Sequence, residues 1–309
     1  FSYLNAILTG LLTAAGNSRT PFIVNVAGLV FNVVLDPVLI FGIGPFPELG
    51  VSGAAAATVT AQALVSLLFF KAVLREKVLF PHLRLWVLVP VKVWREIVRI
   101  GVPSAVQNLI YAGISMILTR LITGWGDLAV AAQRVGSQIE SVSWMVGDGF
   151  SAAVNAFLGQ NYGAKRYDRV RRGYFCAIAM TAAWGLCTTF LLIGMARLLF
   201  SIFLQEEEVM AIGVNYLRIV GLSQMFMMVE QTSIGAFSGL GRTLYPSIVS
   251  VTFTSARIPV AVLLSSVMGL SGIWWALSIS SMVKGCILFV SFVLFLYVFL
   301  ERKKDEKTV

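Results

Sequence analysis

The sequence predicts an all-α integral membrane protein, and three observations support this prediction: its composition, the length of its apolar segments and the placement of its basic residues. Of its 309 residues, 58% are hydrophobic and only 13% are charged, and its mean hydropathy is +0.84. A soluble domain of this length needs far fewer apolar residues to fill its core. A helix needs roughly 20 apolar residues to cross about 30 Å of hydrocarbon, and the chain contains such segments repeatedly.

Eight full membrane spans are predicted from these segments. They lie at residues 21–43, 51–73, 101–123, 128–158, 173–200, 211–240, 245–268 and 272–299. Residues 1–15 are predicted to be the end of a further span, because the chain opens inside an apolar run without the basic flank and cleavage site of a signal peptide. We therefore expect further spans upstream of residue 1.

The basic residues indicate the topology. A net charge of +9 is compatible with a nucleic-acid partner, but Lys and Arg gather in residues 71–99, 165–172 and 302–307. The alternate loops, around "GIGPFPELG", "GWGD", "LQEEEV" and "MGLSG", contain no Lys or Arg. This alternation follows the positive-inside rule and predicts a multi-pass protein of the cell (plasma or inner) membrane with a cytoplasmic C-terminus. No soluble domain offers a basic face for nucleic acid.

An internal repeat divides the chain. "GLLTAAGNSRTPF" from Gly10 and "GAFSGLGRTLYPS" from Gly235 share the pattern G-x5-G-x4-P at a numbering offset of 225. "GVSG" from Gly50 and "GLSG" from Gly269 repeat at an offset of 219. Six predicted spans separate matching elements, and an even number makes both copies face the same way, which predicts parallel six-helix repeats. The first repeat is incomplete in this chain, and the intact protein is expected to have twelve spans.

The repeat defines the predicted domains. Residues 1–73 are the C-terminal half of an N-terminal lobe, with the end of span four and spans five and six. Residues 74–100 are a cytoplasmic connection between the lobes, 101–299 are a C-terminal lobe of spans seven to twelve, and 300–309 are a cytoplasmic tail.

Four motifs in this order resemble the multidrug and toxic compound extrusion (MATE) family of cation-coupled antiporters. They are "GNSRTPFIVNVAGLVFNVVLDPVLIFG", "GVSGAAAAT", "GQNYGAKR" and "GLGRTLYPS". The resemblance implies a two-lobe bundle whose central cavity opens alternately to either side of the membrane. It also implies secondary active export of organic, often cationic, compounds in exchange for H⁺ or Na⁺. The implied partners are a small organic substrate and the lipid bilayer, the intact protein is expected to be a monomer, and no cofactor is expected apart from the coupling ion.

A polar group interrupts the apolar segment "FNVVLDPVLIF". Asn32 and Asp36 are four residues apart, so their side chains lie on one face of a helix. Pro37 donates no backbone hydrogen bond, so it is expected to bend the helix and to free a carbonyl group nearby. Hard oxygen ligands of this kind suit a proton or a small cation, and Thr58 on the next span adds a hydroxyl. The resemblance implies that these residues form a cation-binding site, with Na⁺ at Asp36 the only metal ion expected; the alternative is that Asp36 merely ends its helix near the outer surface.

The predicted seventh span, "PSAVQNLIYAGISMILTRLI", contains no carboxylate, so it does not supply the second Na⁺ site known in the family. Gln107 and Tyr111 on this span, with Glu230 on a later one, are the candidate substrate-binding residues. Two interpretations of Glu230 stay open: a ligand that faces the cavity, or a charge paired with Arg257 or Lys284.

Glu140 and Asp148 lie eight residues apart on one predicted helix, with Arg120 and Arg134 as candidate ion-pair partners. Their role is left open by the sequence.

An enzyme is not expected, and no catalytic residue is assigned. The single histidine, His82, lies in a loop, and the three cysteines, interpreted as small core residues, lack CxxC spacing. A membrane-embedded acyl or glycosyl transferase would need clustered His, Asp or Cys at a membrane face. A flippase for lipid-linked saccharides of the same superfamily is the nearer alternative, but a more basic cavity would be expected of it.

Overall fold

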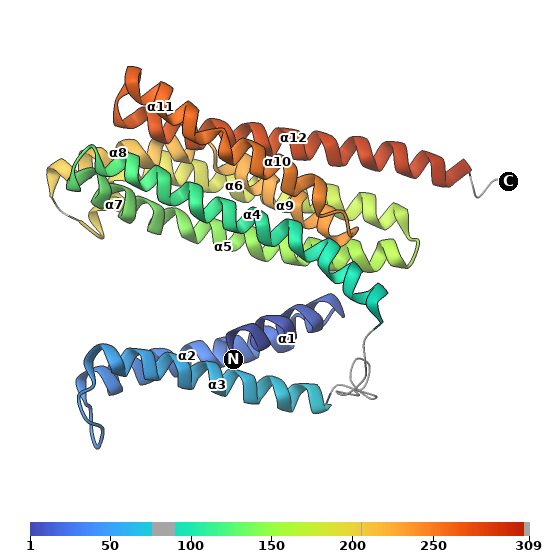
Figure 1. Ribbon diagram of the computed structural model, residues 1–309, viewed down its shortest axis with the longest axis horizontal. Helices are drawn as coiled ribbons and strands as arrows, with labels where there is room; N and C mark the ends of the chain where they lie inside the picture. The colour runs from blue at the N-terminus through green and yellow to red at the C-terminus, as the bar shows by residue number, and fades with distance from the viewer. Residues whose placement is uncertain (76–89, 205, 306–309) are drawn as a thin grey trace. The chain divides into compact units, whose positions relative to one another are not determined.

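The computed structural model describes residues 1–75, 90–204 and 206–305, and the regular secondary structure of this part of the chain is helical throughout. The helices form two compact units, Phe1–Leu88 and Val89–Val309 (Figure 1). The prediction of an all-α membrane fold is confirmed. His82 and most of the predicted connection between the lobes lie outside the described residues.

The first unit contains three helices, α1 (Ser2–Ala14), α2 (Arg19–Phe41) and α3 (Gly50–Arg75). They pack around a small apolar core, to which all three helices contribute: Leu12, Val24, Val65 and Phe69. A buried polar contact also joins the first and last helices, because the Asn5 amide donates to the side-chain oxygen of Gln62 at 2.9 Å. The unit therefore has its own packed interior.

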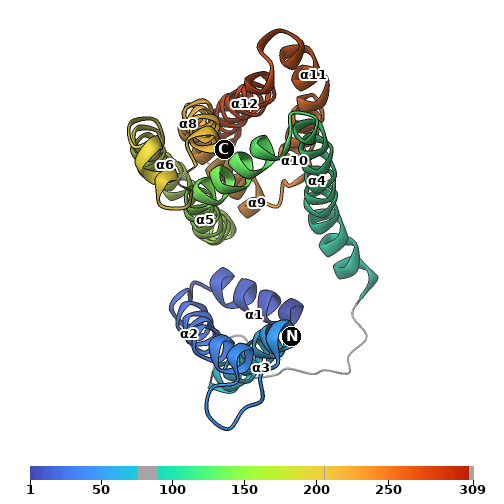
Figure 2. The same cartoon turned by 90° about the vertical axis from the view of Figure 1, so that its left-hand side faces the viewer.

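The second unit contains nine helices within the described residues. They are α4 (Val91–Thr123), α5 (Asp127–Gly163), α6 (Tyr167–Gly194), α7 (Ala196–Ser201), α8 (Glu207–Gly221), α9 (Gln224–Gly239), α10 (Leu244–Ser255), α11 (Arg257–Met268) and α12 (Leu270–Asp305). Figure 2 looks along the axes of most of them. Three core clusters hold the unit together, around Leu217 and Trp274, around Tyr174 and Phe292, and around Ile122.

Six described helices are long and apolar enough to cross a membrane, or seven if α8 and α9 count as one bent span. The predicted span at 211–240 is divided into two helices, since α8 and α9 meet at an angle of 49°. The predicted span at 245–268 is one of the six, although a turn at Ala256 divides it into α10 and α11. The predicted span at 173–200 ends at Gly194, before the short α7. Helix α5 is not among the six, because polar side chains interrupt its apolar surface. Residues 91–100, assigned to the connection, form the first turns of α4.

The cysteines are not core residues as predicted, since Cys176, Cys187 and Cys286 are all exposed free thiols. They lie on helices whose outer faces are apolar. In a membrane such faces contact lipid, so apolar character does not distinguish an outer face from a core.

The two copies of the internal repeat also share the backbone conformation of their turns. Gly16 and Gly241 are equivalent positions of the first repeated motif, and both have positive φ angles, of 90° and 70°. In both turns, the N–H of the following residue donates to the carbonyl five residues earlier, at 2.9 Å. Gly50 and Gly269 begin the second repeated motif, and their φ angles are 53° and 62°. Glycine is needed at these turns because other residues rarely adopt such angles.

A close helix contact also repeats. A Cβ atom added to Gly53 would lie 2.4 Å from the Leu39 carbonyl oxygen, and one added to Gly272 would lie 2.3 Å from the Leu264 carbonyl oxygen. Leu39 and Leu264 have the same numbering offset as the glycines of the first motif. The register of the repeat therefore continues along α2 and along α10–α11.

The packing of α5 against α9 gives a first prediction. A Cβ atom at Gly235 would lie 2.3 Å from the Ser151 carbonyl oxygen, whereas one at Gly149 would meet nothing within 4 Å. Gly235→Ala is expected to lower the free energy of unfolding by about 1–3 kcal/mol, because backbone atoms must move apart. Gly149→Ala is the matched control and should not destabilise, because alanine favours the helix. Thermal unfolding of the purified protein in detergent measures both, and equal stabilities would contradict the prediction.

Candidate transport site

In the first unit, Asn32 and Asp36 lie together as predicted. The Asn32 Nδ2 atom donates to the Asp36 Oδ1 atom at 3.3 Å, and both side chains are half-buried. Helix α2 continues through Pro37 to Phe41 and ends at the left-handed Gly42. Asp36 therefore lies within the helix rather than at its end, and it has no ion-pair partner among the described residues.

Thr58 forms its hydrogen bond within its own helix and not with Asn32 or Asp36. Its side chain is exposed, and its hydroxyl donates to the Ala54 carbonyl of its own helix at 3.0 Å. A hydroxyl that donates its proton still has oxygen lone pairs for a cation, but no hydrogen bond joins Thr58 to Asn32 or Asp36 among the described residues. Its part in a cation site stays a prediction.

The helices of the second unit line two adjoining cavities of about 170 Å³ and about 340 Å³. The substrate-binding candidates Gln107, Tyr111 and Glu230 all line the larger one, so the structure brings them together. The two cavities share six lining residues: Tyr111, Trp144, Glu230, Gln231, Thr254 and Lys284. Aromatic rings thus lie beside charged groups, and the rings of Tyr111 and Trp144 are 6.1 Å apart.

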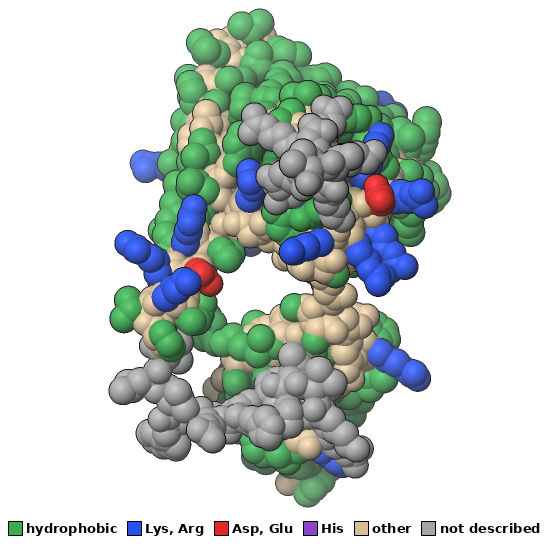
Figure 3. Space-filling view, turned by 90° about the vertical axis from the view of Figure 1, so that its right-hand side faces the viewer, with side chains coloured by type: hydrophobic (Ala, Val, Ile, Leu, Met, Phe, Trp, Pro, Cys, Tyr) green, Lys and Arg blue, Asp and Glu red, His purple; other side chains and the backbone are tan. Residues whose placement is uncertain are grey.

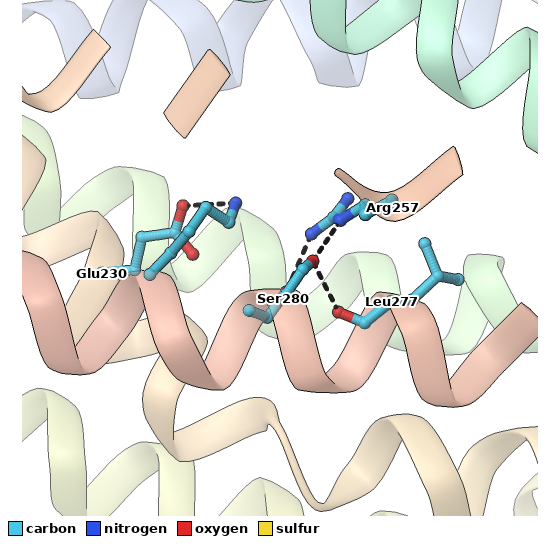
Figure 4. A network of polar contacts seen from close by, with 6 residues as sticks. Glu230, Arg257, Leu277 and Ser280 are labelled. Carbon is cyan, nitrogen blue, oxygen red and sulfur yellow. Dashed lines mark hydrogen bonds and ion pairs between the residues drawn. The ribbon is translucent and has the colours of Figure 1, made fainter. Parts of the chain in front are cut away.

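Glu230 is both paired and directed at the cavity. Lys284 Nζ lies 2.7 Å from Glu230 Oε1, and the two side chains are only 6% and 8% exposed. Figure 4 shows Glu230 beside α12, on the same side of this helix as Arg257. Of the two candidate partners of Glu230, Arg257 and Lys284, it is therefore Lys284 that forms the ion pair.

Glu140 bridges the break between α8 and α9. Its Oε2 atom accepts a hydrogen bond from the Tyr216 hydroxyl of α8 at 3.0 Å, and its Oε1 atom accepts one from the Gln224 amide of α9 at 3.1 Å. The prediction of Arg120 or Arg134 as an ion-pair partner is wrong, since both are exposed and neither forms an ion pair within the described part of the chain. One carboxylate therefore joins both halves of the bent span from α5.

Helix α5 directs a polar stripe at the smaller cavity. Gln133, Ser137 and Glu140 line it, at the spacing of one helix face. Gln133 accepts a hydrogen bond from the Trp274 indole at 3.2 Å. Asp148, further along α5, is exposed, lines the larger cavity and has no ion-pair partner in the described ranges.

Arg257 is the fourth charged group of the smaller cavity, and the whole residue is 7% exposed. Its guanidinium group bonds to the hydroxyls of Ser280 and Ser281, the latter at 2.9 Å (Figure 4). Arg257 was predicted only as a possible partner of Glu230, and four other residues of the site were not predicted from the sequence: Tyr216, Gln224, Trp144 and Ser281. The motif "GLSQ" that ends in Gln224 interrupts an apolar run, and it is the signal that could have located the break.

The outer surface agrees with a membrane protein. Figure 3 shows Lys and Arg side chains gathered at the end of the second unit where α6 begins, beside broad apolar surfaces. The exposed basic residues in and after the α5–α6 turn are Lys165, Arg166, Arg169, Arg171 and Arg172. This is a multi-pass membrane protein.

Comparison with known proteins agrees with the fold and the motifs. A family model described as MatE matches residues 103–263. The chain is 31% identical over 283 residues to the probable multidrug resistance protein NorM of Thermotoga maritima, a match that covers 87% of this chain and 58% of that protein. It is 27% identical over 280 residues to the probable multidrug resistance protein YoeA of Bacillus subtilis, over 89% of this chain and 60% of that one.

The fold is also that of solved MATE structures. The crystal structure of a MATE mutant matches with a TM-score of 0.88 and 21% identity, over 96% of this chain and 67% of that one. The chain thus spans about three fifths of the length of the curated relatives named above. Since the members of this family are transporters, the prediction that the chain is not an enzyme is confirmed. The chain belongs to the multidrug and toxic compound extrusion family.

Proposed function

We propose that the protein containing this chain is a secondary active antiporter that exports small organic, often cationic, compounds in exchange for H⁺ or Na⁺. The observation that carries the proposal is the polar cavity of the second unit, with charged side chains inside a bundle of apolar helices. Charged groups within membrane spans are costly and mark substrate or ion pathways. The names of the NorM and YoeA relatives support a role in multidrug resistance.

The cavity offers two kinds of contact to an organic cation. Tyr111 and Trp144 present aromatic rings, whose faces attract cations. Glu140 and Asp148 carry carboxylates without an ion-pair partner among the described residues. A compound with an aromatic body and a positive group would satisfy both.

The coupling ion is proposed to bind at Asp36. A proton or Na⁺ would neutralise this carboxylate, which shares α2 with Asn32 and Pro37. Because Pro37 removes one backbone hydrogen bond, α2 bends more easily at this position. Ion binding that favours one of two helix conformations is what coupling to substrate requires. A cytoplasmic C-terminus and a monomeric state belong to the same proposal.

One observation favours the second candidate, a flippase for lipid-linked saccharides. Arg257 and Lys284 make part of the cavity basic, which suits the phosphates of such lipids. However, Glu230 neutralises Lys284, and Glu140 and Asp148 oppose a polyanionic ligand. The antiporter is therefore the better supported function.

Transport by the full-length protein in proteoliposomes tests the proposal. We expect a fluorescent organic cation to accumulate when a gradient of H⁺ or Na⁺ is imposed, and the accumulation to stop when an ionophore collapses that gradient. The ion whose gradient drives transport is then the coupling ion. Transport that persists without either gradient, or movement of lipid-linked saccharides instead of the cation, would contradict the antiporter.

A further inference from the structure

Arg257 is a buried cation without a carboxylate ion-pair partner in the described part of the chain. The residue is 7% exposed and lines the smaller cavity of the second unit. Its guanidinium group contacts the neutral hydroxyls of Ser280 and Ser281, which lie on α12. The other buried cation of this cavity, Lys284, is neutralised by Glu230 at 2.7 Å. Glu140 of the same cavity is near enough to interact with Arg257 through space, but the two form no ion pair among the described residues. A charge inside a membrane normally pairs directly with a charge of opposite sign, so the guanidinium group can still bind an anion directly.

The guanidinium group still has donors to offer. It carries five N–H groups, and the two serine contacts use the Nε atom and one N–H of the Nη2 atom. The Tyr111 hydroxyl is near enough to interact with the guanidinium group. A third acceptor there would still leave two N–H groups for a ligand. The serine hydroxyls hold the group from one side, against α12 (Figure 4). A carboxylate matches the planar fork of a guanidinium group with two parallel hydrogen bonds.

The internal repeat relates Arg257 to the predicted cation site of the first unit. At the offset of the first motif, Arg257 occupies the position of Asn32, and Ala261 occupies that of Asp36. The shared register is fixed by the glycine contacts of α2 and of α10–α11. Around equivalent positions, one repeat therefore carries a carboxylate and the other carries a guanidinium group.

We propose that Arg257 binds a carboxylate group of the transported compound in the cavity of the second unit. Glu140 lines the same cavity and forms no ion pair among the described residues, so a positive group of the same compound can be accommodated there. The preferred substrates are then amphoteric organic molecules with both a carboxylate and a cationic group. This inference rests on the proposed function and names the class of substrate.

Two forms of one rhodamine dye test the inference, the form with a free carboxylate and its methyl ester. Both carry the same cationic ring system, so they differ only in the group assigned to Arg257. We expect the full-length protein to bind the free carboxylate about tenfold more tightly than the ester, as charge-assisted hydrogen bonds suggest. In Arg257→Gln this preference should fall to about one, through weaker binding of the carboxylate form.

Two further variants distinguish loss of the contact with the carboxylate from loss of folding. Arg257→Lys keeps the buried charge but loses the planar fork, so a reduced but measurable preference is expected. Arg218→Gln removes an exposed arginine of α8 that lines neither cavity, and it should keep the full preference. Size-exclusion profiles and fluorescence titrations in detergent give both folding and affinity.

The outcomes separate the two proposals. Equal affinities of the unaltered protein for the two dyes, or a preference that survives in both Arg257 variants, would overturn the inference while leaving export of the ester intact. If neither dye is bound or transported under any ion gradient, the proposed function itself is contradicted.

Discussion

Replacing Asp36 with asparagine is expected to abolish ion-coupled export while the protein keeps its fold. Asparagine has nearly the same shape, and its side-chain carbonyl can still accept the hydrogen bond from Asn32 that Asp36 now accepts at 3.3 Å. It cannot take up a proton or supply a full negative charge to Na⁺. Because α2 continues beyond this position to Phe41, the helix itself should persist.

Drug accumulation in cells and gradient-driven transport in proteoliposomes measure this effect. The matched control is Asp168→Asn, which removes an exposed carboxylate from the first turn of α6 and should leave export unchanged. Drug resistance at the unaltered level in Asp36→Asn would rule out Asp36 as the coupling residue. Substrate binding without coupling in this variant would separate the cation site from the cavity of the second unit.

Lys284→Met is expected to cost about 3–5 kcal/mol of stability, because it leaves Glu230 as an uncompensated buried charge. The two side chains are 6% and 8% exposed and their charged atoms are 2.7 Å apart. The double variant Lys284→Met with Glu230→Gln removes both charges, so most of the loss should be recovered. Unfolding followed by denaturant titration of the purified protein gives both values.

The exposed ion pair of Arg197 and Glu207 is the control. Its atoms are 3.0 Å apart, but the side chains are 71% and 78% exposed. Arg197→Met should therefore cost less than about 1 kcal/mol, because water screens the pair. If Lys284→Met costs no more than this, or if the double variant is less stable than Lys284→Met, the buried pair does not have the role assigned to it.

The repeat shows how far sequence reasoning reached. The turn glycines Gly16, Gly50, Gly241 and Gly269 were found by spacing alone, and the structure places each of them at positive φ. Spacing succeeds here because a tight turn needs a residue without a side chain, whatever surrounds it. The same kind of reasoning placed a polar pair on one face of α2, because helix geometry is local.

The contacts of the cavity were beyond such reasoning. Glu140 and its two donors Tyr216 and Gln224 are separated by 76 and 84 residues. Arg120 and Arg134 are nearer to Glu140 in sequence and opposite in charge, and a prediction from sequence rests on these two properties. The break between α8 and α9 was also missed, since a hydropathy pattern does not distinguish a continuous apolar span from a bent one.

The sequence by itself determined the membrane class, the approximate spans, the repeat and the polar pair of α2, because hydrophobic length and helix period act locally. Only the tertiary structure decided which faces are buried, that Lys284 neutralises Glu230, and that Arg257 has no acidic ion-pair partner within the described residues. Between 11% and 39% of the residues in each apolar window are buried. Lipid and protein core are both apolar, so composition does not show which side chains face the cavity; that depends on how the helices pack.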